Sequence, residues 1–266
     1  MSVCARVNES LQNCFYFKPM TDVASAFSFK SVAAGALALL ASACSTYDRD
    51  NYPRASDFPI HGIDVSKYQG DIDWNAVKSS GVRFVWIRAT EGGDNADEKF
   101  MQNWQGAKAA GIPHGAYHFV YWCRSPQEQI NWFKAHAPVE EDSLPPVLDV
   151  ELTPGSKSCP RVLNMEQVHR EMREMLNEME RYYGKRPVIY STVDFHQGIL
   201  DGDYFTEYPM WVRSTKYYPT VKYKQRRWTF WQYQSDAYIP GIVGKVDRNA
   251  FFGTEQQWQS FMQGNK

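Results

Sequence analysis

The sequence predicts an α/β protein, an irregular (β/α)8-like TIM barrel whose helices are reduced in the C-terminal half. From residue 60 onward, short runs rich in β-branched and aromatic residues alternate with helical patterns, which is typical of βα units and a parallel sheet. Eight such runs are present, and eight strands on one sheet favour a closed barrel. The chain has 266 residues, 43% of them hydrophobic, which is enough to bury one core of this kind.

The eight predicted strands follow one another along the chain with turn signals between them. They cover residues 60–68, 84–90, 113–122, 145–151, 186–192, 209–215, 228–235 and 244–251. The fourth run, PPVLDVE, is apolar except for Asp149 and Glu151. Because side chains alternate along a strand, these two acids share a face with Val147, while Leu148 and Val150 point toward the covering helices.

Helical patterns fill the connections of the first half. One predicted helix ends at Gly111, a natural C-terminal stop. The segment Ser125–Glu128 (SPQE) predicts a capping box with proline at the first helical position, which opens a helix through Ala135. The clearest helix covers residues 164–183 and carries an apolar stripe that we interpret as core packing: Val168, Met172, Met175, Leu176, Met179 and Tyr183.

The connections shorten after the fifth predicted strand. Residues 214–227 (STKYYPTVKYKQRR) show no amphipathic stripe. We therefore expect the late portion to be an incomplete or flattened part of the barrel.

The N-terminal region has the layout of a secretory signal. Lys30 precedes an apolar run that ends in the small residues before Cys44, and this run is too short for a transmembrane helix. The junction resembles a bacterial lipobox, in which Cys44 would be lipidated and become the mature N-terminus. Ala41 stands where lipoboxes usually carry leucine, so plain cleavage after Ala43 is the alternative. Residues ahead of Met20 look like an extension before another start.

The expected organisation has three parts. We expect residues 1–44 to form the extension and the signal or lipoprotein signal, residues 45–58 a polar tether, and residues 59–266 the barrel domain. We expect export to a bacterial cell envelope, with a lipid anchor at the periplasm or membrane surface. Secretion without an anchor is the alternative.

Five cysteines are distributed unevenly. Cys4 and Cys14 lie in the extension and Cys44 at the cleavage site, which leaves Cys123 and Cys159 in the domain. An oxidising compartment would allow those two to pair, and two free buried thiols are the alternative. Neither cysteine has His or Cys neighbours at metal-ligand spacing, and the six histidines show no paired ligand spacing, so we expect no metal.

Charge narrows the choice of partners. The formal net charge is −1 and no long run of one sign occurs, so the chain lacks the basic footprint of a nucleic-acid-binding protein. A basic membrane-surface patch is absent as well, so a membrane contact is expected only through the lipid anchor. We expect a monomer that needs no cofactor.

Four acids fall near strand ends, where barrel enzymes collect their chemistry: Asp64, Asp149, Glu151 and Asp247. Two carboxylates as close as Asp149 and Glu151 raise the pKa of one of them, which keeps a proton available near neutral pH. A proton donor beside a second carboxylate is what cleavage of a glycosidic bond requires.

Structural roles are the alternative for each acid. Arg88 or Arg213, also on predicted strands, could hold Asp149 and Glu151 in a buried ion-pair network. Asp64 and Asp247 could instead close turns. Glu91, in a glycine-containing loop, is a weaker candidate that could simply anchor that loop.

Aromatic residues accompany the acids at the same strand ends. This shared position, more than the aromatic content of 15% alone, predicts a cleft that stacks on sugar rings. The candidate substrate-binding residues are Tyr68, Tyr117, Tyr190, Trp211, Trp231 and Tyr233.

These segments together resemble glycoside hydrolase family 25, the β-1,4-N-acetylmuramidase lysozymes. The matching segments run in family order from residue 61 to about 252: GIDVSKYQGDIDW (62–74), FVWIRATEG (84–92), GAYHF (115–119), PPVLDVE (145–151), VIYST (188–192), MWVR (210–213), FWQYQS (230–235) and VDRNAF (246–251). The D-x-E pair alone would be weak, since chitinases and other barrels also use it, but the ordered set is specific.

The resemblance implies cleavage of the bond between N-acetylmuramic acid and N-acetylglucosamine in peptidoglycan. By position, Glu151 resembles the general acid, and Asp149 resembles its partner, either a nucleophile or a stabiliser of an oxazolinium formed by the substrate. Asp64 and Asp247 resemble the remaining acids of the cleft. Tyr117, Tyr190 and Trp231 fall where family members line the substrate groove.

Two departures from the family pattern stand out. Arg88 replaces the lysine that is more usual before ATEG, which leaves the charge unchanged. The pair Cys123 and Cys159 is not a general family feature, and both follow predicted strands at the barrel mouth, which suggests a disulfide between the third and fourth loops.

The competing functions are a non-catalytic cell-wall-binding lipoprotein and another β-glycan hydrolase, such as a chitinase-like one.

Overall fold

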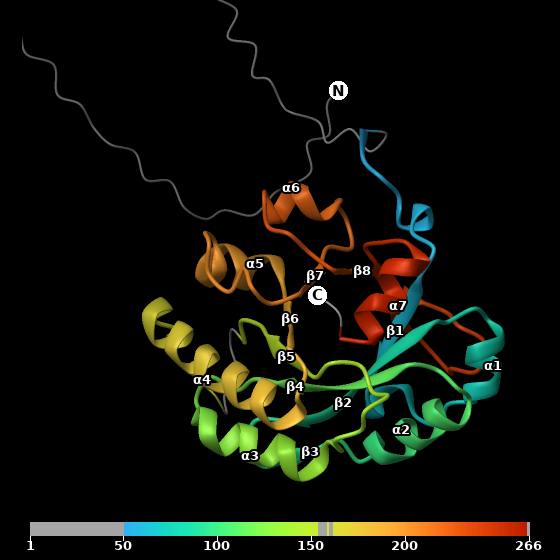
Figure 1. Cartoon of the computed structure of the whole chain (residues 1–266), viewed down its shortest axis with the longest axis horizontal. Helices are drawn as coiled ribbons and strands as arrows, with labels where there is room; N and C mark the ends of the chain where they lie inside the picture. The colour runs from blue at the N-terminus through green and yellow to red at the C-terminus, as the bar shows by residue number, and fades with distance from the viewer. Residues whose placement is uncertain (1–50, 154–158, 160–161, 265–266) are drawn as a thin grey trace, which may run out of the picture. The chain divides into compact units, whose positions relative to one another are not determined.

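The computed structural model describes residues 51–153, 159 and 162–264. In this part of the chain eight strands close into a ring, in which β9 pairs with both β8 and β1 (Figure 1). The ring consists of β1 (His61–Val65), β2 (Phe84–Glu91), β4 (His114–Phe119), β5 (Val147–Val150), β6 (Val188–Ser191), β7 (Met210–Arg213), β8 (Phe230–Ala237) and β9 (Val246–Phe251). A short strand, β3 (Asn95–Ala96), extends the edge of β2. The predicted α/β barrel is confirmed, and each predicted strand is present.

One strand of the barrel runs in the reverse direction. The pairs from β1–β2 round to β7–β8 are parallel, but β9 is antiparallel to β8 and to β1. Residues 238–245 join β8 to β9 as a hairpin, whereas a parallel return would need a crossover of about a dozen residues or more. The expectation of a parallel sheet is therefore wrong at its last strand.

Alternation along the strands separates two apolar cores. Leu148 and Val150 belong to an outer core shared with the helices, whereas Val147 belongs to an inner core within the ring, as its predicted face required. The inner core is rich in large rings and comprises Ile60, Phe84, Trp86, Leu144, Val147, Val188, Tyr190, Trp211, Phe230, Phe251 and Trp258. Gly115 leaves space for this packing, because a Cβ there would lie 2.7 Å from the indole nitrogen of Trp86.

A C-terminal helix, α7 (Glu255–Met262), closes one end of the barrel. Its Trp258 packs on Phe84, Phe230 and Phe251, with ring centroids 5.2, 6.4 and 5.3 Å away. Phe84 and Phe230 begin their strands and Phe251 ends the reversed one, so all three mark the same end. The opposite end, where the parallel strands finish, remains open.

Four helices cover the outside of the first half, and Figure 1 shows them in succession around the ring: α1 (Trp74–Ser79), α2 (Phe100–Ala109), α3 (Pro126–His136) and α4 (Met165–Tyr183). The side chain of Asn164 caps α4, and Gly184 ends it in a left-handed conformation with φ 66°. The predicted core stripe is confirmed, because Val168, Met172, Met175, Leu176 and Met179 are all buried and the partly buried Tyr183 packs against the same core.

The start of α3 differs in one detail from its prediction. The Ser125 hydroxyl accepts a hydrogen bond from the Glu128 N–H at 3.2 Å, and Pro126 occupies the first turn. The Glu128 carboxylate, however, binds the Arg124 guanidinium instead of completing the capping box. A charged partner next to the cap therefore outcompetes the backbone N–H.

The helices of the second half are short, as the sequence predicted. After β6 come α5 (Val193–Phe195) and a single π-helical segment, η4 (His196–Leu200), and after β7 comes α6 (Pro219–Tyr223). Within the described residues no helix is long and apolar enough to cross a bilayer.

Part of the expected tether packs on the barrel. Tyr52 stacks on Tyr218 with centroids 5.4 Å apart, and Phe58 lies edge-on to Trp228 and Trp231 at 5.9 and 6.3 Å. Tyr52 and Phe58 stand on either side of the short 3-10 helix η2 (Ala55–Asp57) along the chain. Residues 51–58 thus extend the outer core beside β8, which the hairpin leaves without a long covering helix. The predicted signal and Cys44 lie outside the described residues.

Candidate active site

A cleft of about 410 Å³ opens where the parallel strands finish. All four predicted acids line it, although Asp247 stands at the beginning of its strand. It reaches this end only because β9 is reversed. The full lining is Asp64, Val65, Ser66, Tyr68, Gln69, Arg88, Tyr117, Phe119, Asp149, Glu151, Tyr190, Trp211, Arg213, Gln232, Ser235 and Asp247.

Asp149 and Glu151 form a coupled pair at the end of β5. Burial raises the pKa of Asp149 well above its ordinary value, and the Glu151 and Asp64 carboxylates raise it further. Burial also raises the pKa of Glu151, while Arg213 and the hydrogen bond with Asp149 oppose that shift. Because burial and mutual repulsion disfavour two charges here, the pair holds one proton more tightly than two separate carboxyl groups would. Within the described part of the chain, the buried Oδ1 of Asp149 has no hydrogen-bond partner.

Asp64 is held by two amides. Its Oδ2 accepts hydrogen bonds from Asn249 Nδ2 at 2.7 Å and Gln232 Nε2 at 3.0 Å. Burial and the neighbouring Asp247 nevertheless raise the pKa of Asp64 to about 8. Burial also raises the pKa of Asp247, and Arg213 opposes it. The cleft therefore favours protonated acids, which suits proton donation.

Arg88 and Arg213, the two arginines considered as partners of the acids, have different surroundings. Arg88 pairs with Glu91 at 3.1 Å and with Asp97 at 3.0 Å, so the ion-pair network forms beside the catalytic candidates and not with them. Glu91, the last residue of β2, also accepts hydrogen bonds from the side chains of Asn95 and Tyr121, so it holds the turn that follows, which agrees with its weaker candidacy. Arg213 lines the cleft and, within the described part of the chain, makes no ion pair within 4.0 Å. Its charge acts on Glu151 and Asp247 through the pKa effects above.

Four of the six predicted aromatic residues line the cleft. Tyr68, on the 3-10 helix η3 (Lys67–Gln69), is 77% exposed and lies 5.0 Å from the Arg88 guanidinium. Tyr190 donates from its hydroxyl to Gln232 Oε1 at 3.0 Å, and Trp211 donates from its indole nitrogen to Asn249 Oδ1 at 2.8 Å. These two form the floor, and Tyr117 completes the set.

Trp231 and Tyr233 lie outside the cleft lining. Trp231 is 7% exposed within the outer core and donates to the Ser214 carbonyl at 2.8 Å. The Tyr233 hydroxyl bonds His61 Nδ1 at 3.0 Å on that same outer side. Because side chains alternate on β8, the inward residue is Gln232, which lies between them. The expectation that both aromatics line the groove placed them on the wrong face of this strand.

Three polar residues of the site were missed as candidates: Gln232, Asn249 and Arg213, the last of which was considered only as an ion-pair partner. Two of the three have a signal in the strand period. Arg213 follows Trp211 by two positions and Asn249 follows Asp247 by two, so each shares the inward face of a predicted site residue.

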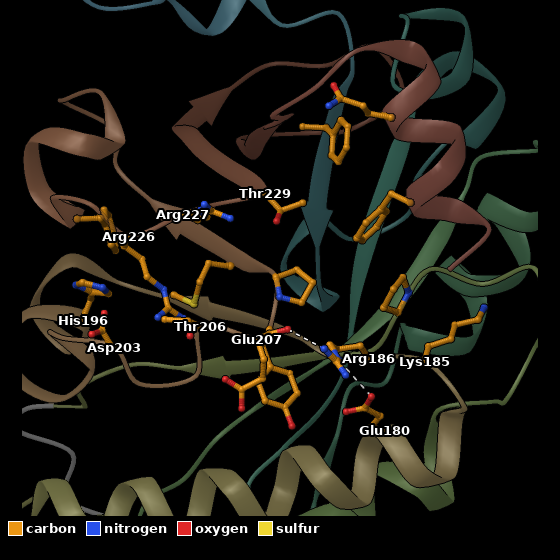
Figure 2. Close-up of a pocket in the computed structure, with 18 of the residues that line it drawn as sticks. Glu180, Lys185, Arg186, His196, Asp203, Thr206, Glu207, Arg226, Arg227 and Thr229 are labelled. Carbon is orange, nitrogen blue, oxygen red and sulfur yellow. Dashed lines mark hydrogen bonds and ion pairs between the residues drawn. The ribbon is translucent and has the colours of Figure 1, made fainter. Parts of the chain in front are cut away.

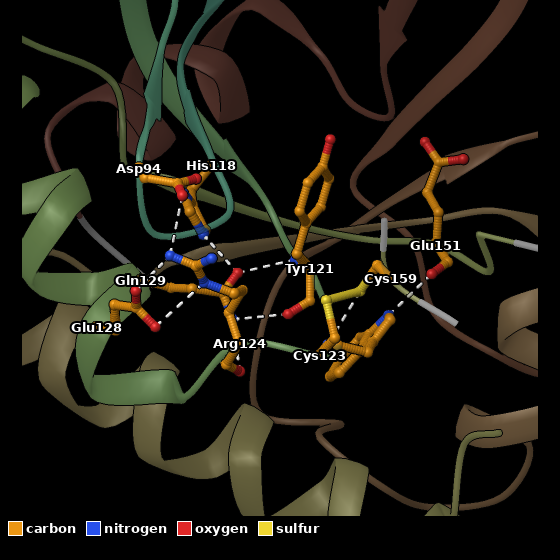
Figure 3. The surroundings of a disulfide bond; sticks show 10 residues. Asp94, His118, Tyr121, Cys123, Arg124, Glu128, Gln129, Glu151 and Cys159 are labelled. Carbon is orange, nitrogen blue, oxygen red and sulfur yellow. Dashed lines mark hydrogen bonds and ion pairs between the residues drawn. A yellow bond between two sulfur atoms is a disulfide. The ribbon is translucent and has the colours of Figure 1, made fainter. Parts of the chain in front are cut away.

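Cys123 and Cys159 form a disulfide, with a Cα–Cα distance of 5.3 Å (Figure 3). It joins the loop after β4 to the segment after β5, as the pairing hypothesis required. Figure 3 shows Glu151 close by, with a hydrogen bond that reaches its main chain.

The comparisons with known proteins agree with this geometry. The sequence model of "Glycosyl hydrolases family 25" matches residues 63–242, which is more than half of the chain. The chain belongs to this family.

Two curated relatives share a similar fraction of identical residues with this family 25 protein. The uncharacterized protein YegX of Escherichia coli K12 is 36% identical over 223 residues, covering 79% of this chain and 76% of the relative. Lysozyme M1 of Streptomyces globisporus is 35% identical over 207 residues, covering 73% and 68%. A solved family 25 glycosyl hydrolase from Bacillus anthracis superposes with a TM-score of 0.72 at 32% identity, covering 79% of this chain and 96% of that one.

A second cavity, of about 1330 Å³, lies near the opposite end of this family 25 barrel, between the end of α4, residues 201–209, α6 and α7 (Figure 2). None of the predicted site residues lines it. Its charged groups largely satisfy one another: Arg186 pairs with Glu180 at 3.2 Å and donates to the Glu207 carbonyl at 3.1 Å, and Lys224 pairs with Asp201 at 2.6 Å. The smaller cleft is therefore the active site candidate.

Proposed function

We propose that this protein is a peptidoglycan hydrolase that cleaves the β-1,4 bond between N-acetylmuramic acid and N-acetylglucosamine. The observation that carries the proposal is the meeting of Asp64, Asp149, Glu151 and Asp247, all with raised pKa, in one cleft of a family 25 barrel. Raised carboxyl pKa values in a cleft are what acid catalysis of glycoside hydrolysis requires.

Glu151 is the proton donor in this proposal. It is only partly buried, while Asp149 is 7% exposed, so Glu151 is the member of the pair that substrate meets first. Its proton passes to the bridging oxygen as the bond from C1 of N-acetylmuramic acid to that oxygen breaks, and N-acetylglucosamine leaves with a free hydroxyl. Water then supplies the oxygen at C1, and its proton returns to the carboxylate.

Asp149 acts on the other side of the same step, as nucleophile or as stabiliser of an oxazolinium formed by the substrate's N-acetyl group. Retention needs two closely spaced carboxyl groups, and Glu151 is the neighbouring charge with the largest effect on the pKa of Asp149. We therefore propose net retention. NMR of the first product should show the β-anomer, and an initial α-anomer would contradict this route.

The cleft offers rings and charge for binding the glycan. Tyr68, Tyr117, Tyr190 and Trp211 line it, and we propose that they contact the sugar faces and N-acetyl groups. Asp64 and Asp247 would orient the substrate and tune the charge felt by Glu151.

We further propose that the protein is exported and anchored by lipid on Cys44, with residues 1–44 as the signal segment. Residues 45–50 would then be the tether, because residues 51–58 pack on the catalytic domain. Labelled palmitate should enter the wild-type protein and the Cys14→Ser variant but not Cys44→Ser. Equal labelling of all three would refute the anchor.

A monomer is the expected state, and light scattering in detergent measures it directly.

The bond specificity is tested by digesting purified peptidoglycan and determining the reducing ends by mass spectrometry. Reducing-end muramic acid is the expected result. Reducing-end glucosamine would indicate a different β-glycan hydrolase. Binding to peptidoglycan without any release of fragments, from acid to neutral pH, would indicate a cell-wall-binding protein.

A further inference from the structure

We propose that Trp122 is a positioning residue for Glu151, and that the disulfide between Cys123 and Cys159 holds Trp122 in place. The inference deepens the proposed hydrolase function and rests on it. It makes the geometry of the proton donor depend on a crosslink that only an oxidising compartment stabilises.

Glu151 needs support from outside the sheet. It follows Val150, the last residue of β5, so the regular strand ends just before it. The indole nitrogen of Trp122 donates a hydrogen bond to the main-chain carbonyl of Glu151 at 2.9 Å. This contact fixes the main chain from which the catalytic side chain extends.

Trp122 joins the three loops that surround Glu151. It lies three residues after the end of β4, is 1% exposed and stacks on Phe195, with centroids 5.3 Å apart and an interplanar angle of 16°. Phe195 belongs to α5, which follows β6, and its neighbour Asp194 raises the pKa of Glu151. One indole thus links the segments after β4, β5 and β6 at the proton donor.

The disulfide fastens this junction. Cys123 is adjacent to Trp122, and its bond to Cys159 connects two positions 36 residues apart that lie on either side of Glu151 along the chain. The Cys123 N–H also points to Cys159 Sγ at 3.1 Å. In the oxidised protein the loop with Trp122 and the segment that follows Glu151 are therefore tied together. Reduction removes the tie, so the enzyme reaches full activity only where the disulfide forms.

The first test removes the indole N–H and keeps an aromatic ring, with Trp122→Phe. Since a small displacement of a catalytic group is costly, kcat on peptidoglycan should fall about tenfold or more with KM within about twofold. The control is Trp104→Phe on α2. This change removes the N–H of another buried indole, which donates a hydrogen bond to Glu140 Oε1 at 3.3 Å. Its kcat should stay within about twofold of wild type. Equal kcat for the two variants at similar thermal stability would overturn the proposal.

The second test separates positioning from folding. Wild type should lose kcat on reduction and regain it on reoxidation, whereas Cys123→Ser/Cys159→Ser should be low in kcat and indifferent to reductant. The Trp122 hydrogen bond and the disulfide both act through Glu151. Trp122→Phe should therefore lower kcat by a smaller factor in the Cys123→Ser/Cys159→Ser background than in wild type. Fully additive losses, or reduction that leaves kcat unchanged, would contradict the inference. Inactivity of the oxidised wild type would instead refute the proposed function.

Discussion

Asp64 and Asp247 are direct partners across the antiparallel pair of β1 and β9. Such opposed positions place two like charges close together, and Asp247 is second only to burial as a cause of the raised pKa of Asp64. In a fully parallel barrel, an acid at the start of a strand would lie at the closed end. The reversal of β9 is therefore part of how the cleft acquires its fourth acid.

Replacement of Asp64 by Asn should stabilise the protein increasingly as pH rises. The pKa of Asp64 rises from 3.8 to about 8 on folding, so its stabilising contribution is full below about pH 4 and is lost as pH rises through 8. An asparagine has no proton to lose and can still accept the two amide hydrogen bonds. The melting temperature of Asp64→Asn relative to wild type should therefore increase by roughly 5 °C between pH 5 and pH 8.5.

Asp71→Asn is the control of opposite sign. Hydrogen bonds from Lys99 and Gln102 lower the pKa of the exposed Asp71, so its stabilising contribution appears as pH rises. The difference for Asp71→Asn should be small and should become less favourable from pH 3 to pH 6. If the melting-temperature difference between Asp64→Asn and wild type did not change with pH, the buried, proton-retaining state of Asp64 would be contradicted.

Arg213→Met should move the alkaline limb of kcat/KM to higher pH. Arg213 opposes the raised pKa of Glu151 and of Asp247, so its removal lets both acids keep their protons longer. A shift of about half to one pH unit is expected. Arg248→Met, on the outward face next to Asp247, should leave the limb in place. A limb that moves to lower pH in Arg213→Met would show that the arginine does not act on the proton donor.

Tyr68→Ala should weaken substrate binding with little effect on the chemical step. The exposed Tyr68 ring lies against Arg88 in the lining of the cleft. We expect KM to rise about fivefold while kcat changes by less than about twofold. Tyr238→Ala is the matched control, because Tyr238 is 73% exposed but does not line the cleft. Equal KM values for the two variants would remove Tyr68 from the binding surface.

Much of the fold could be predicted because it follows from local patterns. The alternation around Asp149 and Glu151 identified the inward face of β5, and the period of the Met stripe identified the buried side of α4. The direction of β9 could not be predicted in this way, since the period of a strand is the same in both directions. Only the short connection 238–245 indicated a hairpin.

The acids of the site could be predicted from the sequence, but its neutral amide side chains could not. Gln232 and Asn249 carry no charge pattern, and their importance appears only when both amides converge on Asp64. Trp231 was misplaced because aromatic content says nothing about which face of a strand is inward. The inward side of β8 is fixed by contacts across the barrel, from Tyr190 to Gln232.

The central claim is that Glu151 donates the proton that cleaves the muramic acid bond. Its most direct test is the rate of muropeptide release by Glu151→Gln, with Glu255→Gln, an exposed change on α7, as the control. We expect Glu151→Gln to lose roughly a thousandfold or more in kcat with an unchanged melting temperature, and Glu255→Gln to match wild type. Retention of more than about a tenth of the wild-type rate by a folded Glu151→Gln protein would contradict the assignment.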